Sequence, residues 1–165
     1  MNEWIDDFSD LCAADEPAVL VTVAGIRGSA PREIGAKMIV TDKETIGTIG
    51  GGQLEYQCAR VAVGLLQEPG LSLRSFPLGA SMGQCCGGVV EILFEAMGGG
   101  LPAWLRDLQA LHGQREPAVV FTRISTSAPL KFVVTKDRLF GADENAIPTR
   151  LVAKARSILD GDRQP

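Results

Sequence analysis

The sequence predicts an α/β fold, a mixed β-sheet flanked by helices, in a single domain that spans residues 1–165. Short, β-branched apolar runs have the length of buried strands, and longer segments with apolar residues every three or four positions have the helical period. Two strands often follow one another between helices, which favours a mixed sheet over a purely parallel one. A chain of this length can bury a sizeable core as one domain.

The N-terminal part begins with a predicted amphipathic helix, whose apolar residues have helical spacing: Trp4, Phe8, Leu11 and Cys12. Three strands are expected next, at 18–25, 36–41 and 44–50. The first of them, AVLVTVAG, has the continuous apolar run of a strand that is buried on both faces. A second helix is expected from Gly52 to Glu68, where Pro69-Gly70 ends it.

The remaining elements alternate in the same way. Strands are expected at 71–76 and at 89–95, and the second of these alternates apolar and acidic residues as a half-buried strand does. A glycine break at 98–100 precedes a helix with four apolar residues, Trp104, Leu105, Leu108 and Leu111. Strands at 118–122 and 131–135 and a final helix at 151–159 complete the fold.

Composition excludes several classes of protein. The chain has 16 basic and 20 acidic residues and a formal charge of −4, without the basic imprint of a nucleic-acid surface. No segment approaches the ~20 apolar residues that span a membrane. The acidic start, MNEWIDDFSD, does not resemble a signal peptide, so a cytoplasmic protein with reduced cysteines is expected.

The first candidate binding loop is RGSAPREIGAK, residues 27–37, which follows the most buried strand. Ligands of α/β proteins often bind at the ends of buried strands. Ser29 could donate a hydrogen bond to a phosphate, and Arg32 could bind an anion through two parallel hydrogen bonds. The alternative is a surface turn with solvated charges, and spacing alone favours it.

The second candidate loop is GTIGGGQLE, residues 47–55, between a strand and a helix. The amides of Gly50, Gly51 and Gly52 could approach a phosphate, and the helix dipole would add to the attraction. The loop has neither the G-x-G-x-x-G dinucleotide pattern nor the G-K-[ST] of a Walker loop. The alternative is a tight turn with positive φ, although three successive glycines favour ligand binding.

The third candidate loop carries two adjacent thiols, Cys85 and Cys86, followed by Gly87 and Gly88. Adjacent cysteines do not have the spacing of zinc ligands or of a C-x-x-C redox motif, and a disulfide between them would be strained. The glycines let other groups approach the sulfur atoms, which could bind a soft metal or a sulfur-rich cofactor. This interpretation is favoured over two buried structural cysteines.

The other cysteines and the single histidine have structural interpretations. Cys12 and Cys58 are expected on apolar helix faces, where a free cysteine behaves as a small hydrophobic residue. His112 precedes Gly113 at a helix end, where it can cap carbonyl groups. A nucleophile paired with histidine is therefore poorly supported.

Together the segments GSAPREIGAKMIV, GTIGGGQLE and GQCCGG resemble, in order and approximate spacing, the N-terminal domain of the xanthine dehydrogenase accessory protein family (XdhC/CoxI). The resemblance covers residues 19–95. It implies a chaperone that binds the molybdenum cofactor (molybdopterin), holds it while a cysteine desulfurase helps to install a terminal sulfur, and passes it to a xanthine dehydrogenase-type molybdoenzyme. Many members continue into a second, Rossmann-like domain, and the chain is expected to correspond to the first domain alone.

The resemblance also implies which residues bind the cofactor. The thiol of Cys86, or of its neighbour Cys85, would bind it beside Gly87 and Gly88, with Cys86 as a candidate molybdenum contact. On physical grounds, the loop at 50–52 together with Ser29 and Arg32 would lie against the phosphate or the pterin.

Three functions remain open from the sequence. The leading one is a carrier that does not turn over a substrate, and a homodimer could cover its bound cofactor. The second is a sulfur-relay enzyme that carries a persulfide on Cys85 or Cys86, with a nearby cation lowering the thiol pKa. The third is a nucleotide-binding module that uses the GTIGGG loop.

Overall fold

The computed structural model of the chain describes residues 3–79, 88–124, 130–141 and 147–161. The chain divides into two compact units, Met1–Gly100 and Leu101–Pro165. All three candidate loops belong to the first unit. Among the described residues, no helix has both the length and the apolar character that a bilayer crossing requires.

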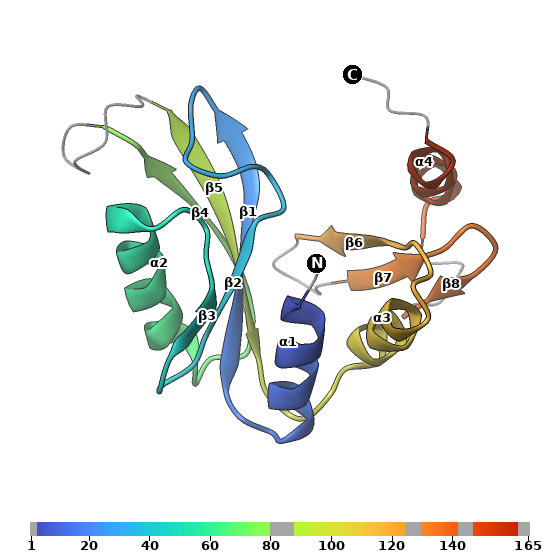
Figure 1. Cartoon of the computed structure of the whole chain (residues 1–165), viewed down its shortest axis with the longest axis horizontal. Helices are drawn as coiled ribbons and strands as arrows, with labels where there is room; N and C mark the ends of the chain where they lie inside the picture. Colours follow the sequence, from blue (N-terminus) through green and yellow to red (C-terminus); the bar gives the residue numbers. More distant parts are fainter. Residues whose placement is uncertain (1–2, 80–87, 125–129, 142–146, 162–165) are drawn as a thin grey trace. The chain divides into compact units, whose positions relative to one another are not determined.

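The first unit is built on a five-stranded sheet with the strand order β3-β2-β1-β5-β4 (Figure 1). Its strands are β1 (Ala18–Arg27), β2 (Lys37–Val40), β3 (Thr45–Gly47), β4 (Gly70–Pro77) and β5 (Val89–Met97). The predicted α/β class, with a sheet that is not purely parallel, is confirmed. Every strand pair that the structure describes is antiparallel.

Helix α2 (Gly52–Leu65) covers one face of this sheet and helix α1 (Trp4–Ala13) covers the other (Figure 1). The apolar side of α2, with Leu54, Cys58 and Ala62, packs on alternate residues of β1, β2 and β5. On α1, the residues Ile5 and Phe8 are buried. Helices on both faces explain why residues 18–23 of β1 are all buried, as the continuous apolar run predicts.

Strand β5 is more buried than its alternating sequence predicts. Val90, Ile92 and Phe94 lie in the α2-side core. Leu93 and Glu95, which point to the opposite face, are buried as well. The alternating pattern therefore predicts the strand correctly, but it predicts more solvent exposure for the second face than the structure has.

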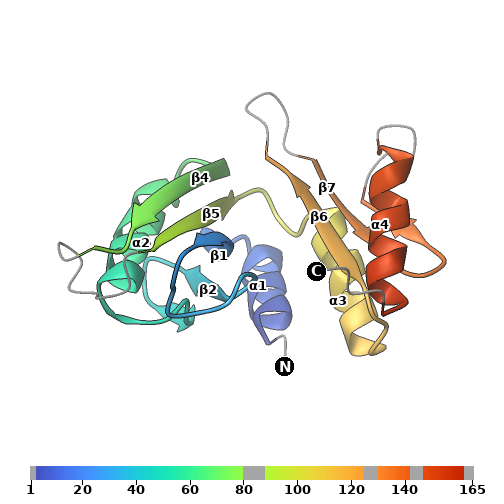
Figure 2. The same cartoon turned by 90° about the horizontal axis from the view of Figure 1, so that it is seen from above.

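The second unit has a three-stranded sheet with the order β6-β7-β8. Its elements are α3 (Ala103–Gly113), β6 (Val119–Arg123), β7 (Leu130–Val134), β8 (Leu139–Phe140) and α4 (Thr149–Leu159). Helices α3 and α4 lie on opposite faces of this sheet (Figures 1 and 2). On the α4 side, Phe132 packs with Val134 and Ala155 and stacks on Phe121 at 5.1 Å between ring centroids.

Replacing Phe94 by alanine should destabilise the first unit strongly. Its ring is fully buried in the α2-side core and lies 6.3 Å from that of Phe76. Removing a buried aromatic side chain costs about 3–5 kcal/mol of unfolding free energy, from lost burial and from the cavity that remains. Urea denaturation measures the change. The matched surface variant Val63→Ala, at a side chain with 52% exposure, should stay within about 0.5 kcal/mol of the wild type.

Candidate functional site

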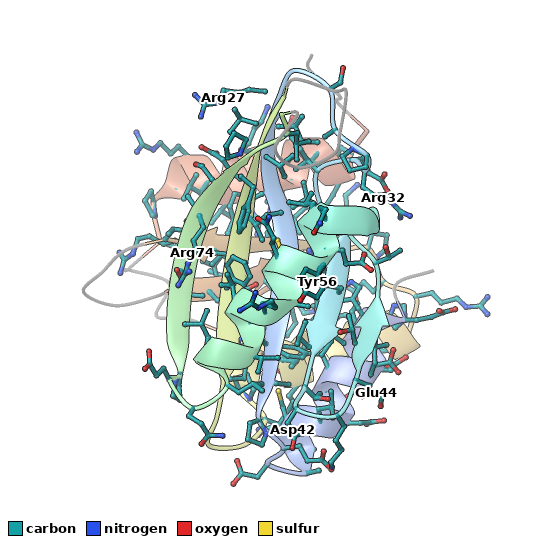
Figure 3. The ribbon with its side chains drawn as sticks, turned by 90° about the vertical axis from the view of Figure 1, so that its left-hand side faces the viewer. Arg27, Arg32, Asp42, Glu44, Tyr56 and Arg74 are labelled. Atoms are coloured by element: carbon teal, nitrogen blue, oxygen red, sulfur yellow. The ribbon has the colours of Figure 1, made fainter. Side chains whose placement is uncertain are left out.

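The first candidate loop connects β1 to β2 and is fixed at its C-terminal end. The Gly35 amide donates to the Val23 carbonyl at 2.8 Å, and the Val23 amide donates to the Ala36 carbonyl at 2.9 Å. Ser29 and Arg32, the two predicted binding residues, are exposed on this loop. Arg27 and Arg32 lie at one end of the sheet, and Asp42 and Glu44 lie at the opposite end (Figure 3).

Arg32 already has an anionic neighbour. Its Nε lies 3.4 Å from Oε2 of Glu33, and both side chains are well exposed. The pKa of Glu33 is lowered from its ordinary value, first by a hydrogen bond from its own backbone amide and then by the Arg32 charge. The pair is solvated, and such surface pairs hold little energy, so Arg32 can exchange Glu33 for a ligand anion at small cost.

The glycine loop between β3 and α2 folds around a carboxylate that the sequence analysis did not single out. Oε2 of Glu55 accepts hydrogen bonds from Thr48 Oγ1 at 2.5 Å, from the Ile49 amide at 3.0 Å and from the Gly51 amide at 3.0 Å. The Gly50 amide donates to Thr48 Oγ1 at 3.1 Å. Glu55 stands in the first turn of α2, where a carboxylate can satisfy amides that have no helical partner.

This internal carboxylate changes the interpretation of the loop. Two of the three amides predicted to bind a phosphate already donate within the loop, that of Gly51 to Glu55 and that of Gly50 to Thr48 Oγ1. The three successive glycines Gly50, Gly51 and Gly52 have φ values of 124°, 73° and 65°, which the turn itself requires. The backbone turn alone therefore accounts for all three glycines.

The pKa of Glu55 is lowered overall by these contacts. Partial burial raises it, and the hydrogen bonds from Thr48, Gly51, Ile49 and Gly50 together outweigh that effect. Glu55 is thus ionised at neutral pH and holds the loop in its present form. A recognisable sequence signal was available, since a threonine and a first-turn glutamate flank the glycines.

Two steric contacts bring the candidate loops together at one end of the sheet. A Cβ atom on Gly50 would lie 2.8 Å from the Pro31 side chain and 3.2 Å from Cγ of Arg32. A Cβ atom on Gly88 would overlap the Ser29 carbonyl oxygen and lie 2.9 Å from the Arg27 carbonyl oxygen. The glycines thus let the second loop and the start of β5 approach the first loop.

Gly88 is the part of the cysteine motif that the structure describes. It is buried, and its carbonyl accepts a hydrogen bond from the Leu78 amide at 2.7 Å, which ties the end of β4 to the start of β5. Cys85, Cys86 and Gly87, the other predicted binding residues of this motif, lie outside the described residues.

The remaining cysteines are buried, as predicted. Cys12 and Cys58 are 3% and 0% exposed and form no disulfide. Burial raises the pKa of Cys12 to about 11. Burial, together with the Glu55 charge, raises that of Cys58 to about 12. Both are therefore protonated at neutral pH and poorly suited to act as thiolate ligands or nucleophiles. Within the described residues, no group of three or more His, Cys, Asp and Glu side chains could hold a metal ion.

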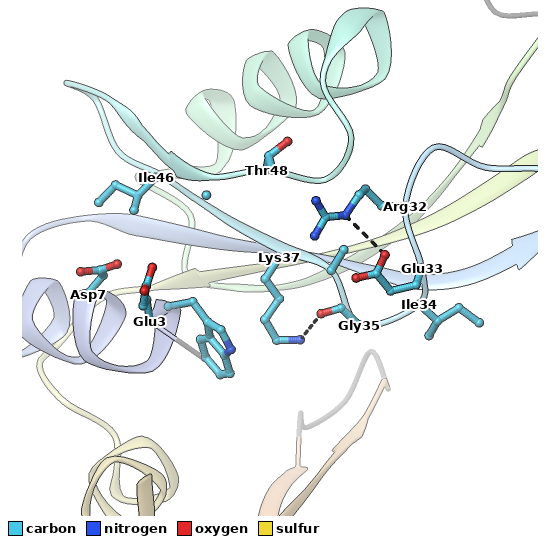
Figure 4. A pocket seen from close by; sticks show the side chains of 12 residues that line it. Glu3, Asp7, Arg32, Glu33, Ile34, Gly35, Lys37, Ile46 and Thr48 are labelled. Atoms are coloured by element: carbon cyan, nitrogen blue, oxygen red, sulfur yellow. Dashed lines mark hydrogen bonds and ion pairs between the residues drawn. The ribbon is translucent and has the colours of Figure 1, made fainter. Parts of the chain in front are cut away.

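A cleft of about 590 Å³ adjoins the converging loops (Figure 4). It lies between the start of α1, the loop between β1 and β2, and strand β3 with the residue that follows it. Its charged side chains are Glu3, Asp7, Arg32, Glu33 and Lys37, and Trp4 and Thr48 also line it. Arg32 therefore lies against the glycine loop at Gly50 and also lines a cavity that is large enough for a small molecule.

Comparisons with known proteins found one family match and a solved structure of similar fold. The model of the XdhC and CoxI family covers the first two candidate loops and the helix that follows them. Residues 11–77 match the XdhC and CoxI family. The match confirms the inferred resemblance over the first two motifs, and the cysteine motif lies beyond the matched residues.

A solved structure shares the fold of most of the chain. A crystal structure described as a xanthine dehydrogenase from Bacillus halodurans superposes with a TM-score of 0.70 at 22% sequence identity. The match covers 91% of this chain and 48% of the other, so the chain spans about half the length of that protein. No curated protein matches the sequence.

Replacing Gly88 by alanine should disturb the contact between the cysteine motif and the first loop. The new methyl group would overlap the Ser29 carbonyl, which is backbone and cannot move aside alone. We expect a loss of about 1–3 kcal/mol in unfolding free energy by urea denaturation. Gly79→Ala is the matched control, because a Cβ there meets nothing within 4 Å, and an equal loss in both variants would contradict the steric argument.

Replacing Glu55 by glutamine should make stability less dependent on pH. The folded-state pKa of Glu55 lies below the ordinary value of 4.5, so its stabilisation is fully present above 4.5 and disappears as the pH falls through the folded-state pKa. Near pH 7 we expect a loss of about 1–2 kcal/mol, since charge-assisted hydrogen bonds are removed. As the pH falls below 4.5 and through the lowered folded-state pKa, the difference between the variant and the wild type in urea denaturation should shrink. The exposed control Glu68→Gln should leave the unfolding free energy near pH 7 within about 0.5 kcal/mol of the wild type.

Proposed function

We propose that this chain is a carrier for the molybdenum cofactor that serves a xanthine dehydrogenase-type molybdoenzyme. The observation that carries the proposal is the match of residues 11–77 to the XdhC and CoxI family, whose members are accessory proteins. The solved structure with the same fold is described as a xanthine dehydrogenase, which supports a role near that enzyme. In this role the chain binds and releases the cofactor as cargo and does not turn it over.

Cys85 and Cys86 supply the thiol that binds the cofactor in this proposal. Only a thiolate binds a soft metal well, and burial keeps the two other cysteines, Cys12 and Cys58, protonated. Cys86 precedes Gly88 by two positions in the sequence, and Gly88 packs against the Ser29 backbone. A thiolate in this motif would present the cofactor beside the first loop, where Arg32 could attract its phosphate.

The remaining steps of the proposal need partners. A cysteine desulfurase would supply the terminal sulfur while the cofactor is held, and the molybdoenzyme would accept the product. A second copy of the chain could shield the bound cofactor from water. The thiolate acts only as a ligand, so release breaks the bond between sulfur and molybdenum without oxidising the cysteine.

Retention of the cofactor by cysteine variants tests this function. The wild type, incubated anaerobically with molybdenum cofactor and separated by ultrafiltration, should retain molybdenum and a fluorescent pterin. The double variant Cys85→Ser, Cys86→Ser should lose at least about tenfold in affinity, since one metal–thiolate contact easily exceeds 1.4 kcal/mol. Each single variant then shows which thiol binds.

Cys12→Ala is the matched control, because it removes a buried thiol that this function does not use. It should retain as much cofactor as the wild type. Equally low retention by the wild type and the double variant would refute the carrier function. Sulfur found as a persulfide on the protein, with no cofactor bound, would point instead to a sulfur-relay enzyme.

A further inference from the structure

The two ends of the cleft beside the candidate loops differ in charge: one has two carboxylates, and the other has Arg32 paired with the carboxylate of Glu33. Glu3 and Asp7 lie at one end, where Glu3 directly precedes α1 and Asp7 lies in its first turn. Arg32 lies at the other end, near Thr48, and Lys37 lies between the two ends (Figure 4). The cleft therefore suits a ligand with hydrogen-bond donors at one end and a negative charge at the other.

We propose that this cleft binds the organic part of the cofactor in one orientation, with the pterin ring at Glu3 and Asp7 and the phosphate at Arg32. The proposal rests on the carrier function and adds to it the residues that bind each end of the ligand. It concerns only side chains that the structure describes.

The acidic end matches the chemistry of a pterin. The pyrimidinone edge of a pterin presents an amino group and a ring N–H side by side, and both are hydrogen-bond donors. A carboxylate has only acceptors and can receive two parallel donors, so it recognises this edge in one geometry. Two carboxylates repel a phosphate, which makes the reverse orientation unfavourable.

The basic end offers the better position for the phosphate. The amides of Ile49 and Gly51 would have to give up an ionised Glu55 before they could bind an anion. Arg32 has to give up only a solvated contact with Glu33, and its guanidinium points into the cleft (Figure 4). Of the residues predicted to lie against the phosphate or the pterin, Arg32 is therefore better placed to bind the phosphate than the amides of the glycine loop.

An aromatic ring and a cation also line the cleft. Lys37 Nζ lies 5.2 Å from the centre of the Trp4 ring and donates to the Gly35 carbonyl at 3.3 Å. Trp4, which follows Glu3 in the sequence, gives the cleft an aromatic side chain for a flat ring system. The volume of about 590 Å³ lies within the range of about 300–1,000 Å³ that is typical of small-molecule sites.

Two fluorescent probes test the orientation without molybdenum: 6-hydroxymethylpterin and its phosphate monoester. In fluorescence titrations the wild type should bind the phosphate ester more tightly than the alcohol. The double variant Glu3→Gln, Asp7→Asn should weaken both probes by roughly tenfold, because both share the pterin. Arg32→Gln should weaken only the phosphate ester, by roughly tenfold, and bring it to the level of the alcohol.

Asp10→Asn is the matched control, because it removes a charge from an exposed residue of α1 outside the cleft. It should bind both probes as the wild type does. Circular dichroism checks that α1 remains folded, and Asp7→Asn alone replaces the double variant if it does not. The assignment is wrong if the wild type binds neither probe, if the acidic variants bind both normally, or if Arg32→Gln weakens both probes equally.

The two proposals can fail separately. A chain that binds the pterin probes in this pattern but retains no molybdenum cofactor keeps the cleft assignment and loses the carrier function. A chain that retains the cofactor through its cysteines, with no effect of Glu3, Asp7 or Arg32 on the probes, keeps the carrier function and loses the assignment.

Discussion

The antiparallel pairing of β1 with β5 determines where the candidate loops leave the sheet. Its register places Ala18 opposite Met97 at one end and Arg27 opposite Val89 at the other. Because Arg27 is the last residue of β1 and Val89 is the first of β5, the loop after β1 and the segment before β5 meet at the same end. The packing of Gly88 on the Ser29 backbone follows from this register. Helices on both faces bury residues 18–23 of β1 and residues 92–96 of β5.

The glycine loop depends on a second constraint, the carboxylate of Glu55. One oxygen gathers a hydroxyl and two amides, so a loop with little conformational preference of its own adopts a single shape. That shape places Gly50 against Pro31 and Arg32. The Glu55 side chain therefore stabilises the glycine loop and, through Gly50, also affects where Arg32 lies at the cleft.

The sequence predicted the elements of the first unit well because their patterns are strong. The apolar run of β1 predicts a buried strand, and the 3.6-residue period of α2 predicts a helix with one face on the core. The sequence predicted less of the candidate functional site. A pattern of glycines shows that the backbone makes an unusual turn, but it does not show whether an external anion or an internal carboxylate occupies that turn.

Other features could not be predicted because they depend on distant parts of the chain. The cleft needs Glu3 and Asp7 from the first helix beside Arg32 and Thr48, and no local pattern joins them. The three glycines at 98–100 predicted a break before a helix, and the first compact unit ends at Gly100. The short strand β8 has only two residues, too few to show a period.

The steric requirement at Gly88 bears on how relatives of this protein are compared. The backbone oxygens of Ser29 and Arg27 exclude any side chain there, whether or not a thiol stands two positions earlier. If this glycine never varied in an alignment of relatives, its conservation would reflect the steric requirement of the sheet. Only conservation of the two cysteines would indicate shared binding chemistry. Relatives that have lost the sulfur atoms but kept this glycine would share the scaffold without sharing the cargo.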